Sequence, residues 1–165
     1  MELKGIIKLS GLAGSPSAAF LSDHSRAALS VSYEEVGSTR RTIDGTLRGF
    51  VIARKASFST SWQLLPSDNA GVVDYRGGSP VVLGAKQLKD VYLNNRMNVF
   101  SLTVYSGALS TTAIGVSDTI GETYAVRFKE CSFSIEKRNA YMSGTWPNSM
   151  VIGDFWNVSV GFEEV

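Results

Sequence analysis

The chain has 165 residues, a length that predicts one domain (residues 1–165) large enough to bury a hydrophobic core. Hydrophobic residues make up 44% and charged residues 19%, which excludes wholesale disorder. The formal net charge of +1 argues against a DNA-wrapping protein or a polybasic membrane binder.

The cysteine content and the lack of long hydrophobic runs indicate the compartment in which the protein folds. The single cysteine, Cys131, cannot form an internal disulfide, so folding needs no oxidising environment. Residues 1–20 lack the apolar run of about 7–15 residues that a signal peptide requires. No segment approaches the ~20 apolar residues of a transmembrane helix. We therefore expect a soluble protein that is made in a cytoplasm and has no membrane partner.

The N-terminal part of the chain predicts strands around a charged hairpin. Residues 5–9 form a short strand, residues 10–20 a loop rich in Gly, Ser and Ala, and residues 29–36 a strand. Asp44-Gly45 is a favoured pair for a two-residue turn with positive φ, so residues 37–52 predict a β-hairpin. Its charged residues indicate an arm that projects from the core: Arg40, Arg41, Asp44 and Arg48.

The most regular alternation in the chain runs from residue 56 to residue 64. Successive side chains of a strand point to opposite faces, so the pattern predicts one buried face and one polar face. The predicted buried face carries Ala56, Phe58, Thr60, Trp62 and Leu64. The predicted polar face carries Ser57, Ser59, Ser61 and Gln63.

The second half predicts one helix and three strands. The helix, about residues 84–96, places Leu88, Val91 and Tyr92 on one stripe. The strands are expected over residues 99–105, 123–136 and 154–163, and the middle one changes phase, which predicts a β-bulge near Lys129 and Glu130. Residues 66–82, 106–121 and 137–153 are predicted connections. The fold class is therefore mainly β, an antiparallel sandwich or barrel with one flanking α-helix.

Catalytic and metal sites are not indicated. The single histidine, His24, lies beside Ser22, Asp23 and Ser25, but neighbours in sequence rarely converge in a catalytic triad. One Cys and one His cannot form a structural zinc site. We therefore expect no enzyme activity, no cofactor and no metal.

Two binding functions each fit part of the sequence. A nucleic-acid patch could use Arg40, Arg41, Arg48, Arg54 and Lys55, but acidic residues lie nearby and no aromatic residues interleave. Complementary charges across a subunit boundary explain this mixed cluster better. A carbohydrate-binding sandwich could use Tyr141 and Trp146 for stacking on sugars, although packing at a subunit boundary explains both residues more simply.

Five segments in a fixed order resemble structural tail proteins of long-tailed bacteriophages. They are Ser-Asp-His-Ser-Arg (22–26), Val-Ser-Tyr-Glu-Glu (31–35), Arg-Arg-x-x-Asp-Gly-Thr-Leu-Arg (40–48), Lys-x-x-Phe-Ser-x-Ser-Trp-x-x-Leu-Pro-Ser (55–67) and Trp-Asn-Val-Ser-Val-Gly-Phe-Glu-Glu-Val (156–165). The resemblance spans most of the chain and departs at residues 68–82 and 106–121. It is a pattern of strands and turns and contains no catalytic signature.

The resemblance implies a tail tube subunit of the virion, made in the host bacterial cytoplasm. Such subunits form hexameric rings whose sheets join into an inner barrel, and the rings stack into a conduit through which DNA passes without sequence recognition. The partners would be copies of the chain and other tail proteins. The alternatives within this class are a minor tail, tail-terminator or capsid-decoration protein.

Two groups of residues follow from this interpretation. The polar face of residues 57–63 suits a lumen through which DNA must slide. The hairpin 37–52 and the loop 106–121 are expected to contact other subunits and to be mobile in the free monomer.

Overall fold

The computed structural model describes residues 6–67, 81–105, 121–137 and 154–165. Within these residues the chain forms one eight-stranded sheet and one α-helix. The strands are β1 (Ile7–Ser10), β2 (Ala18–Leu21), β3 (Ser30–Arg41), β4 (Leu47–Pro66), β5 (Val81–Leu83), β6 (Phe100–Val104), β7 (Glu122–Lys137) and β8 (Phe155–Glu164). The helix α1 spans Ala85–Asn95. The mainly β fold with one flanking helix confirms the predicted fold class.

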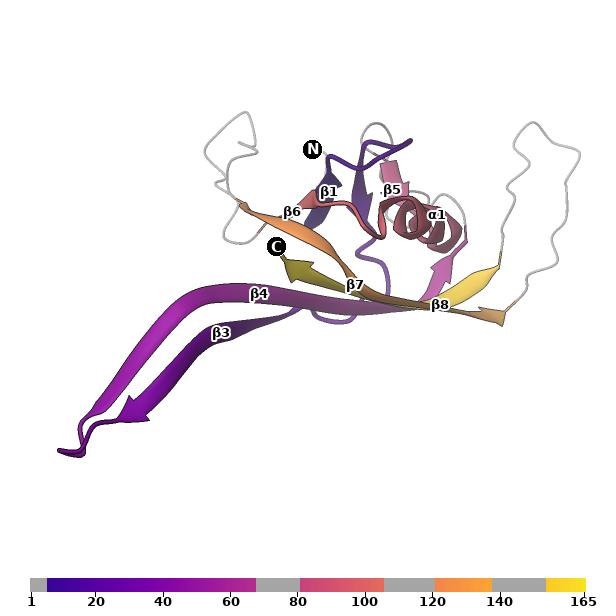
Figure 1. Ribbon diagram of the computed structural model, residues 1–165. Helices are drawn as coiled ribbons and strands as arrows, with labels where there is room; N and C mark the ends of the chain where they lie inside the picture. Colours follow the sequence, from indigo (N-terminus) through magenta and orange to yellow (C-terminus); the bar gives the residue numbers. More distant parts are fainter. Residues whose placement is uncertain (1–5, 68–80, 106–120, 138–153) are drawn as a thin grey trace, which may run out of the picture.

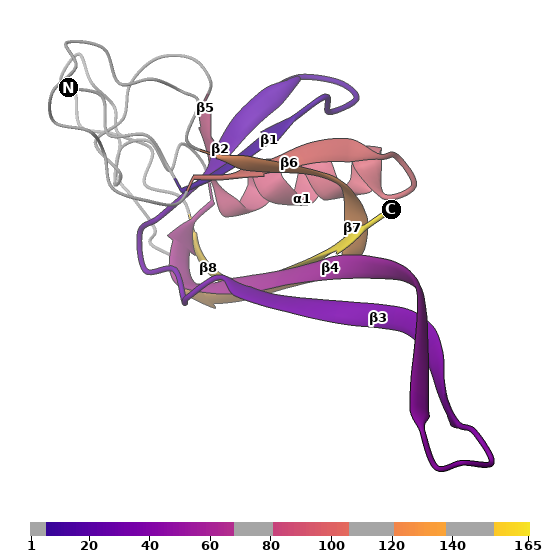
Figure 2. The same cartoon turned by 90° about the vertical axis from the view of Figure 1, so that its left-hand side faces the viewer.

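The sheet has the strand order β3-β4-β8-β7-β6-β1-β2-β5. Neighbouring strands are antiparallel except β2 and β5, so the sheet is mixed where a purely antiparallel one was expected. Figures 1 and 2 show the sheet curling over, with β6, β1, β2 and β5 above a layer made by β4, β8 and β7. The helix α1 packs inside this curl against β7, β8 and β5.

The helix α1 forms where the sequence predicts it. Gly84 donates its backbone N–H to the side chain of Gln87 at 2.9 Å, which satisfies one free donor at the helix start. Leu88 and Val91 are buried, and the ring of Tyr92 meets Phe128 edge-on at 5.3 Å. At the other end, the buried Asn95 side chain accepts a hydrogen bond from the Ala13 backbone at 2.7 Å. The helix thereby closes the core and holds the β1–β2 connection.

The strand from residue 56 departs from its predicted pattern at Leu64. The four expected core residues before it are buried, but Leu64 is 38% exposed whereas Leu65 is 1% exposed. Leu64 adopts a left-handed conformation (φ +56°), and the register with β8 shifts between Trp62 and Leu65. A bulge adds a residue and changes the phase of the side chains, so assigning Leu64 to the core was wrong.

Two short strands lie where the sequence predicted connections. Residues 18–21 form β2, which overlaps the end of the predicted loop 10–20, and residues 81–83 form β5, which overlaps the end of the predicted connection 66–82. Each is too short to show an alternating pattern; β2 becomes a strand by pairing with β1 on one side and β5 on the other, and β5 by pairing in parallel with β2. By contrast, the bulge predicted near residues 129–130 is confirmed by a register shift between Phe128 and Glu130.

The remaining predicted connections fall largely outside the described residues. These are 68–80, 106–120 and 138–153, the last of which includes Tyr141 and Trp146.

Candidate functional site

The strands β3 and β4 form one long hairpin that projects from the body of the molecule (Figures 1 and 2). All residues of β3 are exposed, as are most of those facing them on β4 before Ala56. We call residues 30–55 the arm and residues 37–52 the distal arm. The predicted hairpin 37–52 is therefore present, but it is the outer part of a longer ribbon.

The tip of the arm is a three-residue loop rather than the predicted two-residue turn. Thr42 and Thr46 form the closing pair, and Gly45 donates its N–H to the Thr42 carbonyl at 2.8 Å. Gly45 has φ +81°, whereas Asp44 does not have the positive φ that a two-residue Asp-Gly turn requires. The Asp44 carboxylate instead accepts hydrogen bonds from the Thr42 hydroxyl and the Thr46 backbone, and these bonds lower the pKa of Asp44.

The arm changes its pairing register between Val36 and Gly37, close to the place where it bends away from the body (Figure 1). A Cβ atom on Gly37 would lie 2.2 Å from the backbone oxygen of Phe50, closer than any real contact. The bulge therefore requires glycine at this position. At Gly49, in contrast, an added Cβ would meet only the Thr39 methyl group at 3.6 Å.

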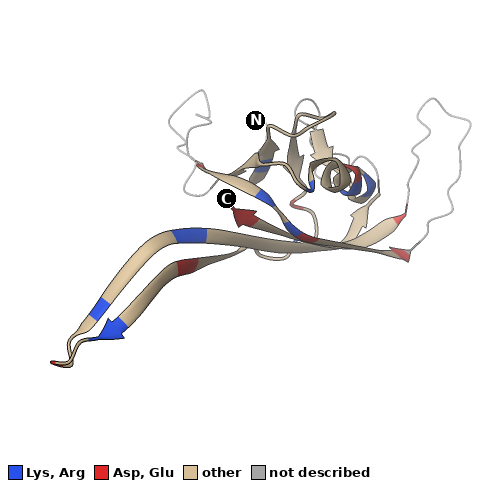
Figure 3. Cartoon of the chain, in the orientation of Figure 1, with Lys and Arg blue, Asp and Glu red and all other residues tan. Residues whose placement is uncertain are grey.

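The arginines of the arm do not form one basic patch. Directly opposite residues of a ladder share a face, so Arg40 and Arg48 lie together on one face of the distal arm. Arg41 is opposite Leu47 on the other face. Arg54 forms an ion pair with Glu35, with its Nε 3.0 Å from the carboxylate oxygen. Figure 3 shows these basic residues along the arm. This division argues against a nucleic-acid patch made of all the predicted residues.

The arm exposes an unusual amount of apolar surface. Its exposed large hydrophobic residues are Val31, Tyr33, Val36, Ile43, Leu47, Phe50, Val51 and Ile52. A two-stranded ribbon by itself is at best marginally stable in water, and large exposed apolar patches mark interaction sites. The described part of the chain does not cover these side chains. Their exposure is typical of an interface with another chain.

The predicted polar face of residues 57–63 belongs to a larger surface that crosses four strands. Register pairs Ser57 and Ser59 with Ser32 and Ser30 of β3, and Ser61 with Ser159 of β8. The row continues to β7, where Ser132 lies opposite Ser159 of β8 and Ser134 lies opposite Asn157. We call this surface the serine face, and its members are Ser30, Ser32, Ser57, Ser59, Ser61, Ser132, Ser134, Asn157 and Ser159.

The serine face lies on the side of the sheet opposite the core. Phe58 and its partners Phe162 and Phe128 point inward and are buried. The members outside residues 57–63 were not predicted, although the same alternation of serine with apolar residues occurs in Ser30–Ser32, Ser132–Ser134 and Val158–Val160. The predicted member Gln63 is exposed at the bulge, just beyond the regular part of this surface.

Charges of opposite sign lie next to each other at the border of the serine face. Arg127 lies 3.8 Å from Glu163, and Glu34 is directly opposite Lys55. The side chain of Glu130 runs over Gly161, where an added Cβ would lie 3.0 Å from its Cγ. The result is a surface of hydroxyl groups without an excess of positive charge.

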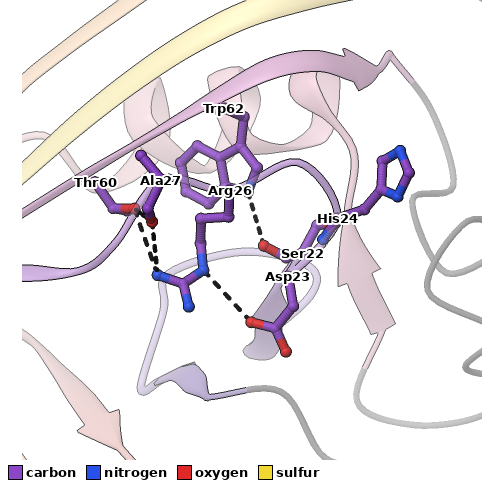
Figure 4. Close-up of polar contacts among 7 residues, drawn as sticks. All are labelled: Ser22, Asp23, His24, Arg26, Ala27, Thr60 and Trp62. Atoms are coloured by element: carbon purple, nitrogen blue, oxygen red, sulfur yellow. Dashed lines mark hydrogen bonds and ion pairs between the residues drawn. The ribbon is translucent and has the colours of Figure 1, made fainter.

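The segment Ser22–Ala27 anchors the base of the arm (Figure 4). The Trp62 indole donates to the Ser22 carbonyl at 2.7 Å, and Ala27 donates its N–H to the Ser61 carbonyl at 2.8 Å. The guanidinium of Arg26, the last residue of the Ser-Asp-His-Ser-Arg segment, lies 3.4 Å from Asp23. The His24 ring points away from this group. The geometry thus serves to hold the chain beside β4 and does not resemble a triad.

Cys131 is a free, half-buried thiol, and burial raises its pKa to about 12. A thiol with such a pKa is not a nucleophile at neutral pH. The described residues contain no group of three or more His, Cys, Asp or Glu that could hold a metal ion. In the same part of the chain, the helix is too short and too polar to cross a membrane.

Comparisons with known proteins identify a shared fold. No protein family and no curated protein matches the sequence. Among solved structures, the chain is similar to one from the tail of an empty GTA particle with C6 symmetry. The two share 12% sequence identity over 97% of this chain and 90% of the other, with a TM-score of 0.50. At this identity the likeness concerns the fold.

Proposed function

We propose that this protein is a structural protein of a phage or phage-like tail, and that its role is that of the repeated tail tube subunit. The observation that carries the proposal is the exposed apolar surface of the arm, which another chain must cover. Its fold, shared with a chain of a C6-symmetric tail particle, supports the same assignment. The role is structural, not enzymatic, and its location is the tail of the virion.

Self-association in this proposal runs through the arm and the edge of the sheet. The strand β3 is an edge strand, and an open edge is a template for pairing with another chain. Copies related by rotation would close into a ring, proposed to be hexameric, and rings would stack head to tail along an open axis. Arg40, Arg41, Asp44 and Arg48 are the proposed inter-subunit contacts of the arm.

The serine face is the proposed lining of the lumen. DNA phosphates bind to Lys and Arg, so a conduit that releases DNA needs a polar surface without unpaired positive charge. The hydroxyl groups of Ser57, Ser59 and Ser61 and the paired charges around them meet this requirement. DNA would therefore pass without sequence recognition.

Electron microscopy of the purified protein tests the proposal. We expect negatively stained preparations to contain long tubes of uniform width. Discrete rings or trimers would instead favour a tail-terminator, minor tail or capsid-decoration protein. A protein that stays monomeric at every concentration would refute the proposed function.

A further inference from the structure

The two faces of the distal arm carry different chemistry. One face, here the apolar face, holds Leu47 and Val51, which are 60% and 55% exposed. The other, the basic face, holds Arg40 and Arg48 directly opposite each other, with the 66% exposed Phe50 next along β4 on the same side. Arg41 lies on the apolar face, but its guanidinium donates to the Gly45 carbonyl of its own turn at 3.3 Å.

A ribbon that lies on one surface buries only one of its faces, because side chains alternate between the two sides of a strand. In the distal arm, large side chains of similar exposure stand on both sides. Covering only one face would leave either Phe50 or Val51 in water. The arm therefore has the pattern of an element that is buried between two surfaces.

The two covering surfaces must differ. Like charges directly opposite each other are destabilising, so Arg40 and Arg48 favour a partner that supplies carboxylates. Neither of them has an ion-pair partner among the described residues. The apolar face needs only apolar contact, which does not depend on salt.

We propose that the distal arm is clamped between two other copies of this chain, with its apolar face on one and its basic face on carboxylates of the other. The inference rests on the proposed function and specifies how its arm is used. A single neighbour that covers one face is not enough.

Copies of this chain supply both kinds of surface. Residues 37–52 contain three arginines and one aspartate and therefore carry +2, so the rest of the chain carries −1 of the total +1. The body also has an exposed apolar corner at the C-terminal end of α1 and just after it, formed by Leu93, Met97 and Val99. The rest of the chain thus has a net charge opposite in sign to that of the distal arm, and it exposes apolar side chains that could cover the apolar face.

Paired substitutions test the clamp. The apolar-face variant combines Leu47→Thr with Val51→Thr, and the basic-face variant combines Arg40→Gln with Arg48→Gln. The control, Lys86→Gln with Lys89→Gln, removes two positive charges from exposed positions on α1, outside the arm. Assembly is measured by sedimentation at about 50 mM and about 500 mM NaCl, between which charge screening changes strongly. Unfolding in urea checks that each variant folds, as expected for residues outside the core.

We expect both arm variants to need at least about tenfold more protein to assemble than the wild type and the control. The apolar-face variant keeps Arg40 and Arg48, so it should still assemble less at about 500 mM NaCl than at about 50 mM, because salt screens charge contacts. The basic-face variant lacks these charges and should have lost most of this difference. If either arm variant assembles like the control, or if both respond to salt alike, the clamp is wrong. If the wild type itself does not assemble, the proposed function fails and not merely the clamp.

A single Phe50→Thr variant provides a second test of the basic face that leaves its charges in place.

Discussion

Arg40 of β3 lies directly opposite Arg48 of β4, on the same face of a ribbon exposed to solvent. Two like charges in this position destabilise a hairpin by roughly 0.2–1 kcal/mol. The free chain therefore carries a pair that weakens its own arm. Such a pair is expected where stability of the free arm is less important than contact with an acidic partner.

Removing one of these charges should make the arm of the unassembled chain more stable. In Arg48→Thr we expect the amides of the distal arm to exchange with deuterium about two- to fivefold more slowly, because the cross-strand repulsion is gone. Arg41→Thr is the matched control, since Arg41 is opposite Leu47 and has no like charge facing it. Equal exchange rates in the two variants would contradict the account of the arginine pair.

Gly37 should be essential for the shape of the arm. In Gly37→Ala the new methyl group would collide with the Phe50 carbonyl, so the bulge must open. We expect the amides of the distal arm to exchange roughly tenfold faster, equivalent to about 1.4 kcal/mol, and tube assembly to fail. Gly49→Ala should leave both nearly unchanged, because its Cβ meets only an ordinary contact. An intact arm in Gly37→Ala would show that the bulge is not needed.

The anchor at the base of the arm should contribute to global stability. Trp62→Phe removes the hydrogen bond to the Ser22 carbonyl, and we expect the free energy of unfolding to fall by about 1–3 kcal/mol. Trp156→Phe is the comparison, because the buried Trp156 Nε1 makes no hydrogen bond within the described part of the chain. Urea unfolding should show that Trp62→Phe costs at least about 1 kcal/mol more. A larger loss of unfolding free energy in Trp156→Phe than in Trp62→Phe would mean that the hydrogen bond to Ser22 is unimportant.

The turn at the tip should depend on pH in the acidic range. The pKa of Asp44 is lowered by its hydrogen bonds to Thr42 and Thr46, so the ionised carboxylate stabilises the folded turn. This stabilisation is present above the unfolded pKa of about 3.9 and is lost as the pH falls through the lower folded pKa. Amide exchange in residues 42–46, corrected for its intrinsic pH dependence, should therefore show less protection below about pH 4. Asp44→Asn should show no such change; the same pH profile in that variant would assign the effect to another group.

A positive charge on the serine face should trap DNA inside assembled tubes. We expect Ser59→Arg tubes to retain a short oligonucleotide at low salt and to protect it from nuclease, because the added guanidinium binds phosphate within the lumen. Asn98→Arg places the same charge at an exposed position after α1, away from the serine face. Its tubes should not protect the oligonucleotide. Digestion at equal rates with both variants would place Ser59 outside the lumen.

The sequence predicted the elements that have strong periodicity. The helix at residues 84–96 and the strand from Ala56 were evident because apolar residues repeat at the spacing of a helix or a strand. The bulge near Glu130 was predicted from a change of phase in the same kind of pattern. Local patterns thus gave most of the fold.

Features that depend on distant parts of the chain were not predicted. Leu64 follows the alternation perfectly, but the ladder with β8 is interrupted beside it and Leu65 takes its place in the core. The edge strand β5 forms by pairing with β2, which lies far from it in the sequence, and β2 is itself held between β1 and β5. Likewise, only the part of the serine face on β4 was predicted; its extension over β3, β7 and β8 became apparent when register aligned the four segments.

The central claim is that copies of this chain form a tube whose lumen is lined by the serine face. A helical reconstruction of assembled tubes by cryo-electron microscopy tests it most directly, because it places each strand relative to the tube axis. We predict that Ser59 and Ser132 face the lumen and that the distal arm lies between two other subunits. Finding Ser59 and Ser132 on the outer wall, or buried between subunits, would contradict the account.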